Sequence, residues 1–390
     1  MHSTYFVALL TTLQCPLQCS HCLYDCSPHV TERMTIGQLK RYVDQIAAAG
    51  IRIINLSGGE PFLLGRDLDE IVDYATKKGL GVHLITAAHW ATSKGAALDR
   101  LRRLADRGLK FLIVSCDDYH QEFVPLQSVK NAIEAAVELG ICFHINVVFT
   151  SQSKITKKFL EDELGELLEG NRHYIPAKEW HAIMRGLAEQ KGAPTLVQLV
   201  SKLTPVEQRN LGRLRTYEIH PEPACDRSGR CALGEDEVVP DFQVGHKTLN
   251  ECNAFQFVLV RPDGSVKGCL GHIHAQTEPE LHLGNLETED LNTILDRAAG
   301  NPIMKCLEWG GPGVIAEYLM EMEPSLELKE RYRLSCDLCS DLFTNPSIRP
   351  LFFKHAAGLY ERLKGGHKEP RHQFIVEGIN QSAPEPAIQY

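Results

Sequence analysis

Three cysteines near the N-terminus constrain this chain more than any other feature. Cys15, Cys19 and Cys22 lie in the stretch CPLQCSHC, with three and then two residues between them, after the apolar run Tyr5 to Leu10. A loop with this spacing can bring three thiols to one face of a metal cluster. An iron–sulfur cluster ordinarily takes four thiolate ligands, so three would leave one iron open. A zinc site is the alternative, because thiolates also suit zinc.

This spacing resembles the cluster motif of the radical S-adenosylmethionine (SAM) superfamily. In that family three cysteines hold a [4Fe–4S] cluster, and the open iron binds the amino and carboxylate groups of SAM. The reduced cluster cleaves SAM to methionine and a 5′-deoxyadenosyl radical, which abstracts a hydrogen atom from the substrate. The resemblance implies that Cys15, Cys19 and Cys22 hold such a cluster.

A second motif, Ser57-Gly58-Gly59-Glu60-Pro61, follows the next apolar run. Paired glycines let a backbone approach a ligand without side-chain obstruction. The glutamate and the exposed backbone can accept hydrogen bonds from an ammonium group. The stretch resembles the GGE motif of the same family, which binds the methionine amino group. The resemblance implies that Gly58, Gly59 and Glu60 contact SAM.

Apolar runs alternate with amphipathic helical stretches along the first half of the chain. The expected strands are Phe6–Thr11, Ile51–Ser57, Gly81–Thr86, Lys110–Ser115, Cys142–Thr150 and Thr216–His220. The expected helices between them are Thr35–Ala49, Leu68–Lys78, Lys94–Arg107 and Ser128–Leu139. Gly50, Gly79, Gly108 and Gly140 follow these helices as stop signals.

Repeated βα units predict a parallel sheet with right-handed crossovers. The fold class expected is α/β: a partial (β/α)6 barrel, related to the eight-stranded barrel, with a smaller C-terminal domain. Ligands of such barrels bind at the carboxyl ends of the strands. The expected domains are a radical SAM core over 1–231 with a helical insertion at 151–213, an auxiliary domain over 232–345, and a C-terminal helix and flexible tail over 346–390.

Polar residues follow the later strands of this sheet. The resemblance implies that Ser115 and Asp117 contact the ribose of SAM or the substrate, and that Asn146 can reach SAM. Arg230, which follows Gly229, fits a family pattern in which an arginine reaches the SAM carboxylate. The candidates for substrate contact or catalysis are Cys116, Asp117, Tyr119, His120 and Glu122, which can equally cap the following loop.

A second cysteine set lies in the C-terminal half. Cys252 precedes an apolar strand, Pro262-Asp263-Gly264 forms a turn, and the chain returns to Cys269, so a hairpin places these two thiols together. Cys336 and Cys339 supply a further pair. Four thiolates can complete a zinc site or a fully ligated iron–sulfur cluster. The arrangement resembles the Twitch and SPASM domains, which implies an auxiliary [4Fe–4S] cluster. Whether Cys26, Cys225, Cys231 or Cys306 is also a ligand stays open.

Composition and charge limit the kinds of partner that the chain is expected to bind. The 390 residues include thirteen cysteines, carry a net charge of -9, and contain no signal segment or long apolar run. We therefore expect a cytoplasmic protein that binds neither nucleic acid nor membrane. In a reducing compartment, clustered cysteines indicate metal ligands rather than disulfides.

The function expected is a radical SAM enzyme that oxidatively modifies a ribosomally made peptide. A fully ligated auxiliary cluster would accept the electron that the substrate radical loses. A dehydrogenase or rearranging enzyme acting on a sugar or cyclitol is the alternative, and a non-catalytic cluster scaffold is the rival of another class. The expected partners are a reduced flavodoxin- or ferredoxin-type electron donor and a separate leader-peptide carrier, because the first strand begins almost at residue 1.

Overall fold

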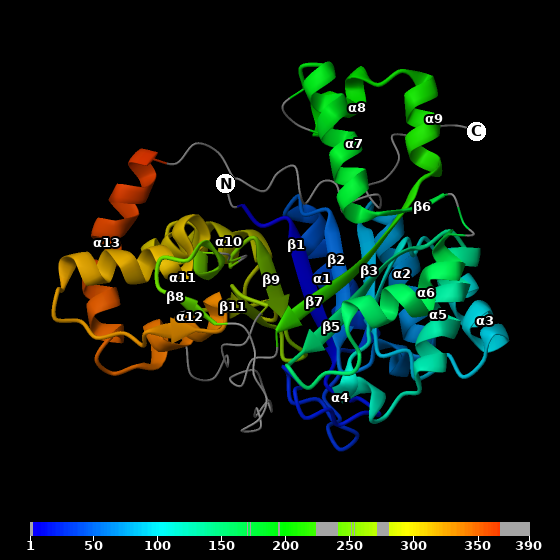
Figure 1. Cartoon of the computed structure of the whole chain (residues 1–390), viewed down its shortest axis with the longest axis horizontal. Helices are drawn as coiled ribbons and strands as arrows, with labels where there is room; N and C mark the ends of the chain where they lie inside the picture. The colour runs from blue at the N-terminus through cyan, green and yellow to red at the C-terminus, as the bar shows by residue number, and fades with distance from the viewer. Residues whose placement is uncertain are drawn as a thin grey trace. The chain divides into compact units, whose positions relative to one another are not determined.

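The computed structural model describes residues 3–169, 171, 173–193, 196–223, 241–250, 252, 254–270 and 281–366. By its internal contacts the chain divides into two compact units. Unit 1 comprises residues 1–63, 149–152 and 223–368, and unit 2 comprises residues 64–148, 153–222 and 369–390. Each unit contains part of the parallel sheet together with helices (Figure 1).

Unit 1 begins with a βαβ element that carries both N-terminal motifs. Strand β1 (Phe6–Thr12) and strand β2 (Ile53–Gly58) pair in parallel, with Phe6 opposite Ile53 and Leu9 opposite Leu56. Both strands are almost entirely buried, which explains their near-continuous apolar sequences. Helix α1 (Ile36–Ala48) connects them, and Thr35 and Gln38 form a capping box at its start.

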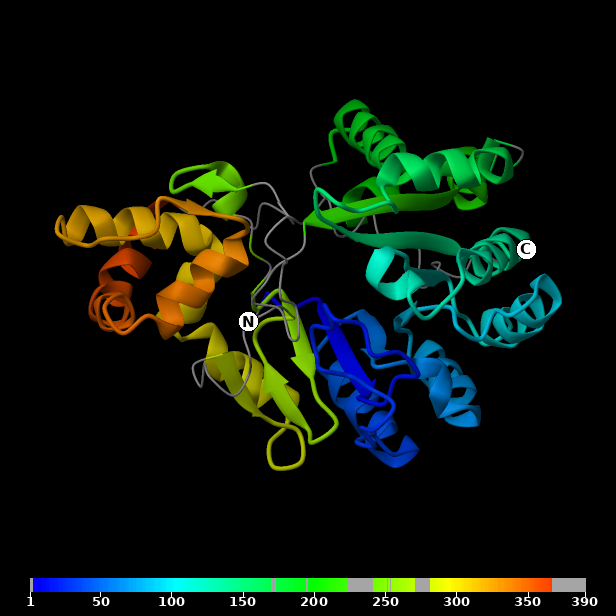
Figure 2. The same cartoon turned by 60° about the horizontal axis from the view of Figure 1, so that its bottom comes forward.

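The C-terminal half of the chain adds to the same unit. Strands β9 (Phe257–Val260) and β10 (Ser265–Lys267) form the predicted hairpin, and β11 (His282–Asn285) pairs with β10. Strand β9 also pairs in parallel with β1, so the strand order is β11-β10-β9-β1-β2. Figure 2 shows the yellow-green hairpin beside the blue β1.

Helices complete unit 1 on the C-terminal side. Helices α11 (Pro302–Met322), α12 (Ser335–Thr344) and α13 (Arg349–Gly366) pack on one another, and α10 (Leu291–Ala299) contacts α1. The remaining elements are the short helices η1 (Pro61–Leu64) and η2 (Lys247–Asn250) and the two-stranded pair β8 (Phe242–Gln243) and β12 (Arg331–Tyr332).

Unit 2 continues the alternation of strands and helices. Its strand order is β3-β4-β5-β7-β6, and the pairs β3–β4, β4–β5 and β6–β7 are parallel. The strands are β3 (Gly81–Thr86), β4 (Phe111–Ser115), β5 (Cys142–Phe149), β6 (Tyr174–Pro176) and β7 (Arg215–Pro223). The helices that precede β6 in the chain are α2 (Arg66–Lys77), α3 (Lys94–Ala105), α4 (Asp118–Gln121), α5 (Leu126–Glu138) and α6 (Lys157–Glu169), and α6 is the first helix of the predicted insertion at 151–213.

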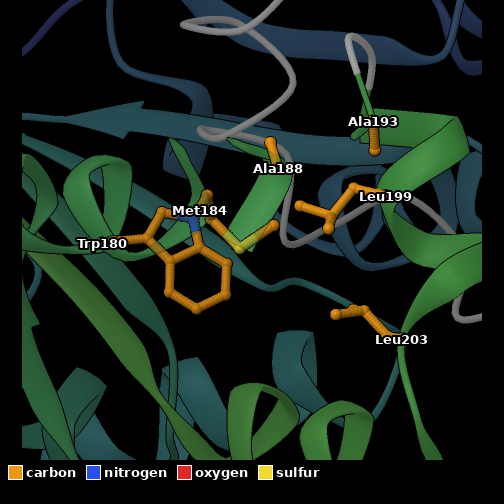
Figure 3. Close-up of a cluster of buried hydrophobic side chains, with 6 residues drawn as sticks. All are labelled: Trp180, Met184, Ala188, Ala193, Leu199 and Leu203. Atoms are coloured by element: carbon orange, nitrogen blue, oxygen red, sulfur yellow. The ribbon is translucent and has the colours of Figure 1, made fainter. Parts of the chain in front are cut away.

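The part of the insertion that follows β6 has a hydrophobic core of its own. Helices α7 (Ala177–Gln190), α8 (Leu196–Lys202) and α9 (Pro205–Arg213) follow β6 and precede β7 along the chain. Figure 3 shows the buried side chains at its centre, which are Trp180, Met184, Ala188, Ala193, Leu199 and Leu203. Their spacing along α7 is helical, so one face of that helix is apolar. The insertion therefore folds around its own contacts.

The predicted α/β fold class, with a parallel sheet, is confirmed. The predicted strand and helix bounds agree with the observed ones to within two residues at most ends. Helices α1, α2, α3 and α5 end just before their predicted glycines, which have positive φ angles. Strand β6, helix α4 and the β1–β9 pairing were not predicted, because short elements and long-range pairings leave little local signal.

The division into units groups residues by contacts and does not test the predicted domain boundaries, which stay predictions. The predicted tail beyond Gly366 lies outside the described residues. Within the described part of the chain, no helix is both long and apolar enough to cross a membrane.

Candidate functional site

The predicted cluster loop follows β1 in unit 1 and is closed at its base by backbone contacts. Leu13 N–H donates to the Glu32 carbonyl (2.8 Å), and Cys15 N–H donates to the Ser27 carbonyl (3.1 Å). Cys22 N–H then donates to the Cys19 carbonyl (3.2 Å), which turns the loop between these two cysteines. All three cysteines are free of disulfide bonds.

Apolar side chains hold this loop against the sheet. Ala8, Leu10, Leu13, Cys26 and Leu259 form a buried cluster, and Cys15 and Cys22 pack against it. Cys26 is almost completely buried and behaves as a small apolar residue. Its backbone N–H donates to Cys22 Sγ (3.3 Å), a contact that stabilises a thiolate at Cys22.

The glycine motif lies directly against the base of the cysteine loop. Gly59 N–H donates to the Thr12 carbonyl (2.6 Å), and Glu60 N–H donates to the Gln14 carbonyl (2.9 Å). A Cβ atom on Gly58 would lie 2.1 Å from the Thr12 oxygen, and one on Gly59 would lie 2.0 Å from the Gln14 oxygen. Only glycine allows so close an approach of two backbones. Two motifs that are far apart in sequence therefore meet in unit 1.

Glu60 is fully buried, and its carboxylate accepts a hydrogen bond from Phe62 N–H (3.2 Å). Three free cysteine thiols, with a backbone donor at Cys22 Sγ, are a donor set that suits an iron–sulfur cluster. The residues that the sequence singled out for that cluster thus fit it.

The second cysteine set lies in the same unit. Burial, followed by the neighbouring Cys269, raises the pKa of Cys252 to about 12. The backbone bond from Phe255 N–H to the Gly268 carbonyl places both cysteines near the open end of the hairpin. The Ala254 N–H donates to Cys252 Sγ (3.5 Å), and the Phe255 N–H donates to the Gly268 carbonyl (2.7 Å). A metal ion would favour the thiolate form of both cysteines.

Backbone strain marks the same place. The buried Phe255 has a φ of 66°, a left-handed conformation that is costly for a bulky residue. Cys336 and Cys339 lie one turn apart on α12, which packs against η2, two residues before Cys252. Joint ligation by all four cysteines stays a prediction. Cys306 donates its thiol to the Ala356 carbonyl (3.4 Å), and Cys225, Cys231 and Arg230 lie outside the described residues.

In unit 2 the predicted residues after β4 are placed by their own structural contacts. Asp117 is fully buried and caps α4, where it accepts hydrogen bonds from His120 N–H (3.0 Å) and bonds the His120 ring (2.9 Å). Ser115 lies opposite Asn146 in the β4–β5 register. Burial, with Asp117 and Asp118, raises the pKa of Cys116 to about 12. Tyr119 is half-buried and Glu122 is exposed.

The structure also places together residues that sequence reasoning missed. Glu218 on β7 lies near His144 on β5 (3.7 Å, Oε2 to Nδ1) and His220 (3.6 Å, Oε1 to Nδ1). The hydrogen bond with His220 lowers the pKa of Glu218 against the opposing effect of burial, and His144 and His181 act in the same direction as His220. The alternation of Glu218 and His220 along a strand was the available signal, because residues two apart share one face.

The comparisons with known proteins agree with the cysteine loop. Residues 9–161 match the family described as the radical SAM superfamily. The putative peptide biosynthesis protein YydG of Bacillus subtilis is 29% identical over 159 residues, which cover 40% of this chain and 49% of that protein. The PqqA peptide cyclase of Rhodopseudomonas palustris is 36% identical over 113 residues, covering 28% of each chain.

The GTP 3′,8-cyclase of Aquifex aeolicus is 32% identical over 170 residues, covering 40% of this chain and 49% of that protein. Each of these matches spans less than half the length of the relative.

Proposed function

Because residues 9–161 form a radical SAM domain, we propose that the chain is an enzyme that cleaves SAM reductively and abstracts a hydrogen atom from its substrate. The observation that carries this proposal is the contact between the glycine motif and the base of the cysteine loop, where Glu60 N–H bonds the Gln14 carbonyl. In this proposal Cys15, Cys19 and Cys22 hold the cluster, and Gly58, Gly59 and Glu60 bind the methionine part of SAM.

A [4Fe–4S] cluster with an open iron, once bound, supplies the electron that breaks SAM into methionine and a 5′-deoxyadenosyl radical. The chain's own residues prepare that site. Cys26 N–H donates to Cys22 Sγ and so stabilises the thiolate that a metal needs. The two glycines keep side chains out of the contact between β2 and the loop, so the backbone of the glycine motif can bond directly to the base of the loop.

The substrate of this proposal is a ribosomally made peptide, and the reaction is an oxidative modification. Two relatives support it, since one is named as a peptide biosynthesis protein and another as a peptide cyclase. The GTP 3′,8-cyclase is named for a small molecule, so a metabolite substrate is the second candidate. A reduced flavodoxin- or ferredoxin-type donor, a separate leader-peptide carrier and a cytoplasmic location belong to the same proposal.

Oxidation requires the substrate radical to lose one electron and, in most cases, one proton. Cys252, Cys269, Cys336 and Cys339 would hold an auxiliary cluster that accepts the electron. In unit 2, Glu218 with His144 and His220 offers a carboxylate–imidazole group that can accept the proton. Ser115, Asp117, Asn146 and Arg230 remain the proposed further contacts of SAM.

Anaerobic reconstitution tests the proposal. The reconstituted chain is mixed with dithionite and SAM, and 5′-deoxyadenosine is measured by chromatography. We expect release from the natural chain and none from the triple variant Cys15→Ala, Cys19→Ala, Cys22→Ala. Release by the triple variant would show that the cleavage site lies elsewhere. A chain that binds iron at both sites but never cleaves SAM would instead be a cluster scaffold.

A further inference from the structure

Tyr24 reaches from the N-terminal cysteine loop to the second cysteine set. It follows Cys22 by two residues, and its hydroxyl donates to the Leu270 carbonyl (2.8 Å), next to Cys269. The two residues are 246 positions apart in the chain. A single hydrogen bond therefore joins a loop of the first set to a residue adjacent to the second.

The strand pairing shows where the two cysteine sets lie relative to β1. Strands β1 and β9 run in the same direction, with Phe6 opposite Phe257 and Leu9 opposite Val260. Cys252 precedes β9, and Phe255 N–H bonds the Gly268 carbonyl, so the second set lies where β1 begins. The first set follows the end of β1, and the cysteine loop brings Tyr24 back onto the buried cluster of β1 and β9 side chains, within reach of Leu270.

Packing holds Tyr24 between the two cysteine sets. Tyr24, Cys22 and Leu270 all pack against the buried cluster of β1 and β9 side chains that includes Ala8 and Leu259. This packing fixes the tyrosine ring where its hydroxyl can donate to the Leu270 carbonyl.

We propose that Tyr24 is a positioning residue that couples the two cysteine sets, so that ordering one set by a metal centre favours ordering of the other. The coupling is reciprocal, since any gain that the first centre confers on the second is conferred equally in return. That the two cysteine sets hold iron–sulfur clusters rests on the proposed function. The hydrogen bond from Tyr24 to Leu270, which connects the two sets, does not. The proposal makes the loading of iron cooperative across the chain.

Native mass spectrometry tests the cooperativity directly. The chain is reconstituted anaerobically with less iron and sulfide than it can bind, and species with no, about four and about eight irons are counted, as two cubane clusters require. We expect the natural chain to populate mainly the first and last. Tyr24→Phe removes the donor and should raise the ratio of half-loaded to fully loaded chains about fivefold, as the loss of one ordinary hydrogen bond implies.

Tyr174→Phe is the matched control. Tyr174, which is buried whereas Tyr24 is partly buried, also donates its hydroxyl to a backbone carbonyl, that of Ile141 (2.7 Å), but it lies in unit 2. This variant should load like the natural chain. An unchanged half-loaded fraction in Tyr24→Phe, or an equal rise in Tyr174→Phe, would overturn the coupling.

Alkylation of the metal-free chain by N-ethylmaleimide tests the effect of the Tyr24–Leu270 hydrogen bond independently of the proposed function. Without metal, Tyr24→Phe should speed alkylation of both Cys22 and Cys269, and the buried Cys116 reports whether the variant remains folded. If only one of the two thiols changes, Tyr24 acts locally and the proposal is wrong. If Tyr24→Phe unfolds, 3-fluorotyrosine at this position keeps the shape and strengthens the donor, and should slow both alkylations. Failure of the natural chain to cleave SAM would leave these results intact.

Discussion

The close approach of β2 to the cysteine loop depends on the absence of a side chain at Gly59. A Cβ atom at this position would lie 2.0 Å from the Gln14 carbonyl oxygen, which belongs to backbone that cannot easily move. We expect Gly59→Ala to push β2 away from the cysteine loop, to cost about 1–3 kcal/mol of stability as overpacking does, and to lower the yield of 5′-deoxyadenosine. Thermal unfolding and the SAM cleavage assay measure the two effects.

Gly95→Ala serves as the control for that substitution. Gly95 lies in α3, and an added Cβ would meet no atom within 4 Å. This variant should be as stable as the natural chain or more stable, because alanine favours a helix over glycine by up to about 1 kcal/mol. If both variants behave alike, the close approach at Gly59 is not essential.

His83 predicts a pH dependence of stability. The side chain is buried on β3 and stacked on Phe111, and burial, with a smaller effect of His144, lowers its pKa to about 3. The unfolded chain takes up a proton near its ordinary pKa of 6.5, whereas the folded chain does not. Stability is therefore lost as the pH falls from 6.5 towards 3, by about 2 kcal/mol between pH 7 and pH 5.

Urea unfolding at the two pH values, followed by tryptophan fluorescence, measures that loss. His83→Gln should remove most of it, and replacement of the exposed His246 by Gln should not. An equal pH dependence in the natural chain and His83→Gln would mean that other groups control acid stability.

At the scale of elements, the C-terminal half contacts the first βαβ element at α1 as well as through the pairing of β9 with β1. Gln45 on α1 accepts a hydrogen bond from Leu291 N–H (2.9 Å) and donates to the Leu286 carbonyl (3.4 Å). Leu291 begins α10, so its N–H has no partner within the helix. We expect Gln45→Ala to cost about 1 kcal/mol and to speed hydrogen exchange at Leu291. The exposed Asn292→Ala on the same helix should leave that exchange rate nearly unchanged.

The insertion allows a prediction about a whole group of helices. Leu199 is fully buried in the core of α7, α8 and α9. Leu199→Ala should destabilise this core by about 2–5 kcal/mol, since it leaves a cavity. Because the insertion has its own core, exchange should rise in residues 174–214 and stay slow in β4. Val206→Ala, at a side chain that is 56% exposed, should change neither. Faster exchange in β4 would show that the insertion and the sheet unfold together.

At the scale of the whole molecule, iron content separates the two cysteine sets. The natural chain should bind about eight irons as two cubanes, and the triple variant of Cys15, Cys19 and Cys22 about four. The fourfold variant Cys252→Ala, Cys269→Ala, Cys336→Ala, Cys339→Ala should also retain about four irons, and should still cleave SAM. Zinc in place of iron at either set would contradict the corresponding assignment. Metal analysis by inductively coupled plasma mass spectrometry measures both.

The sequence alone was sufficient for the local features of this protein. Helical periodicity, glycine stops and buried strand runs depend on neighbouring residues, so strands β1 to β5, helices α1, α2, α3 and α5, and the helical character of the insertion could be predicted. The spacing of Cys15, Cys19 and Cys22 and the Gly58-Gly59-Glu60 motif likewise predicted the match of residues 9–161 to the radical SAM superfamily. The proximity of Cys252 and Cys269 could be predicted because a short turn joins their strands.

The tertiary structure decided the features that depend on distant residues. The parallel pairing of β9 with β1, the bond from Tyr24 to Leu270 and the grouping of Glu218 with His144 join segments that share no local pattern. Each arises because strands with continuous apolar sequences can pair with many partners, and only the burial of the whole core selects one. For this reason the sequence could identify the two cysteine sets, while only the fold could bring them into one unit.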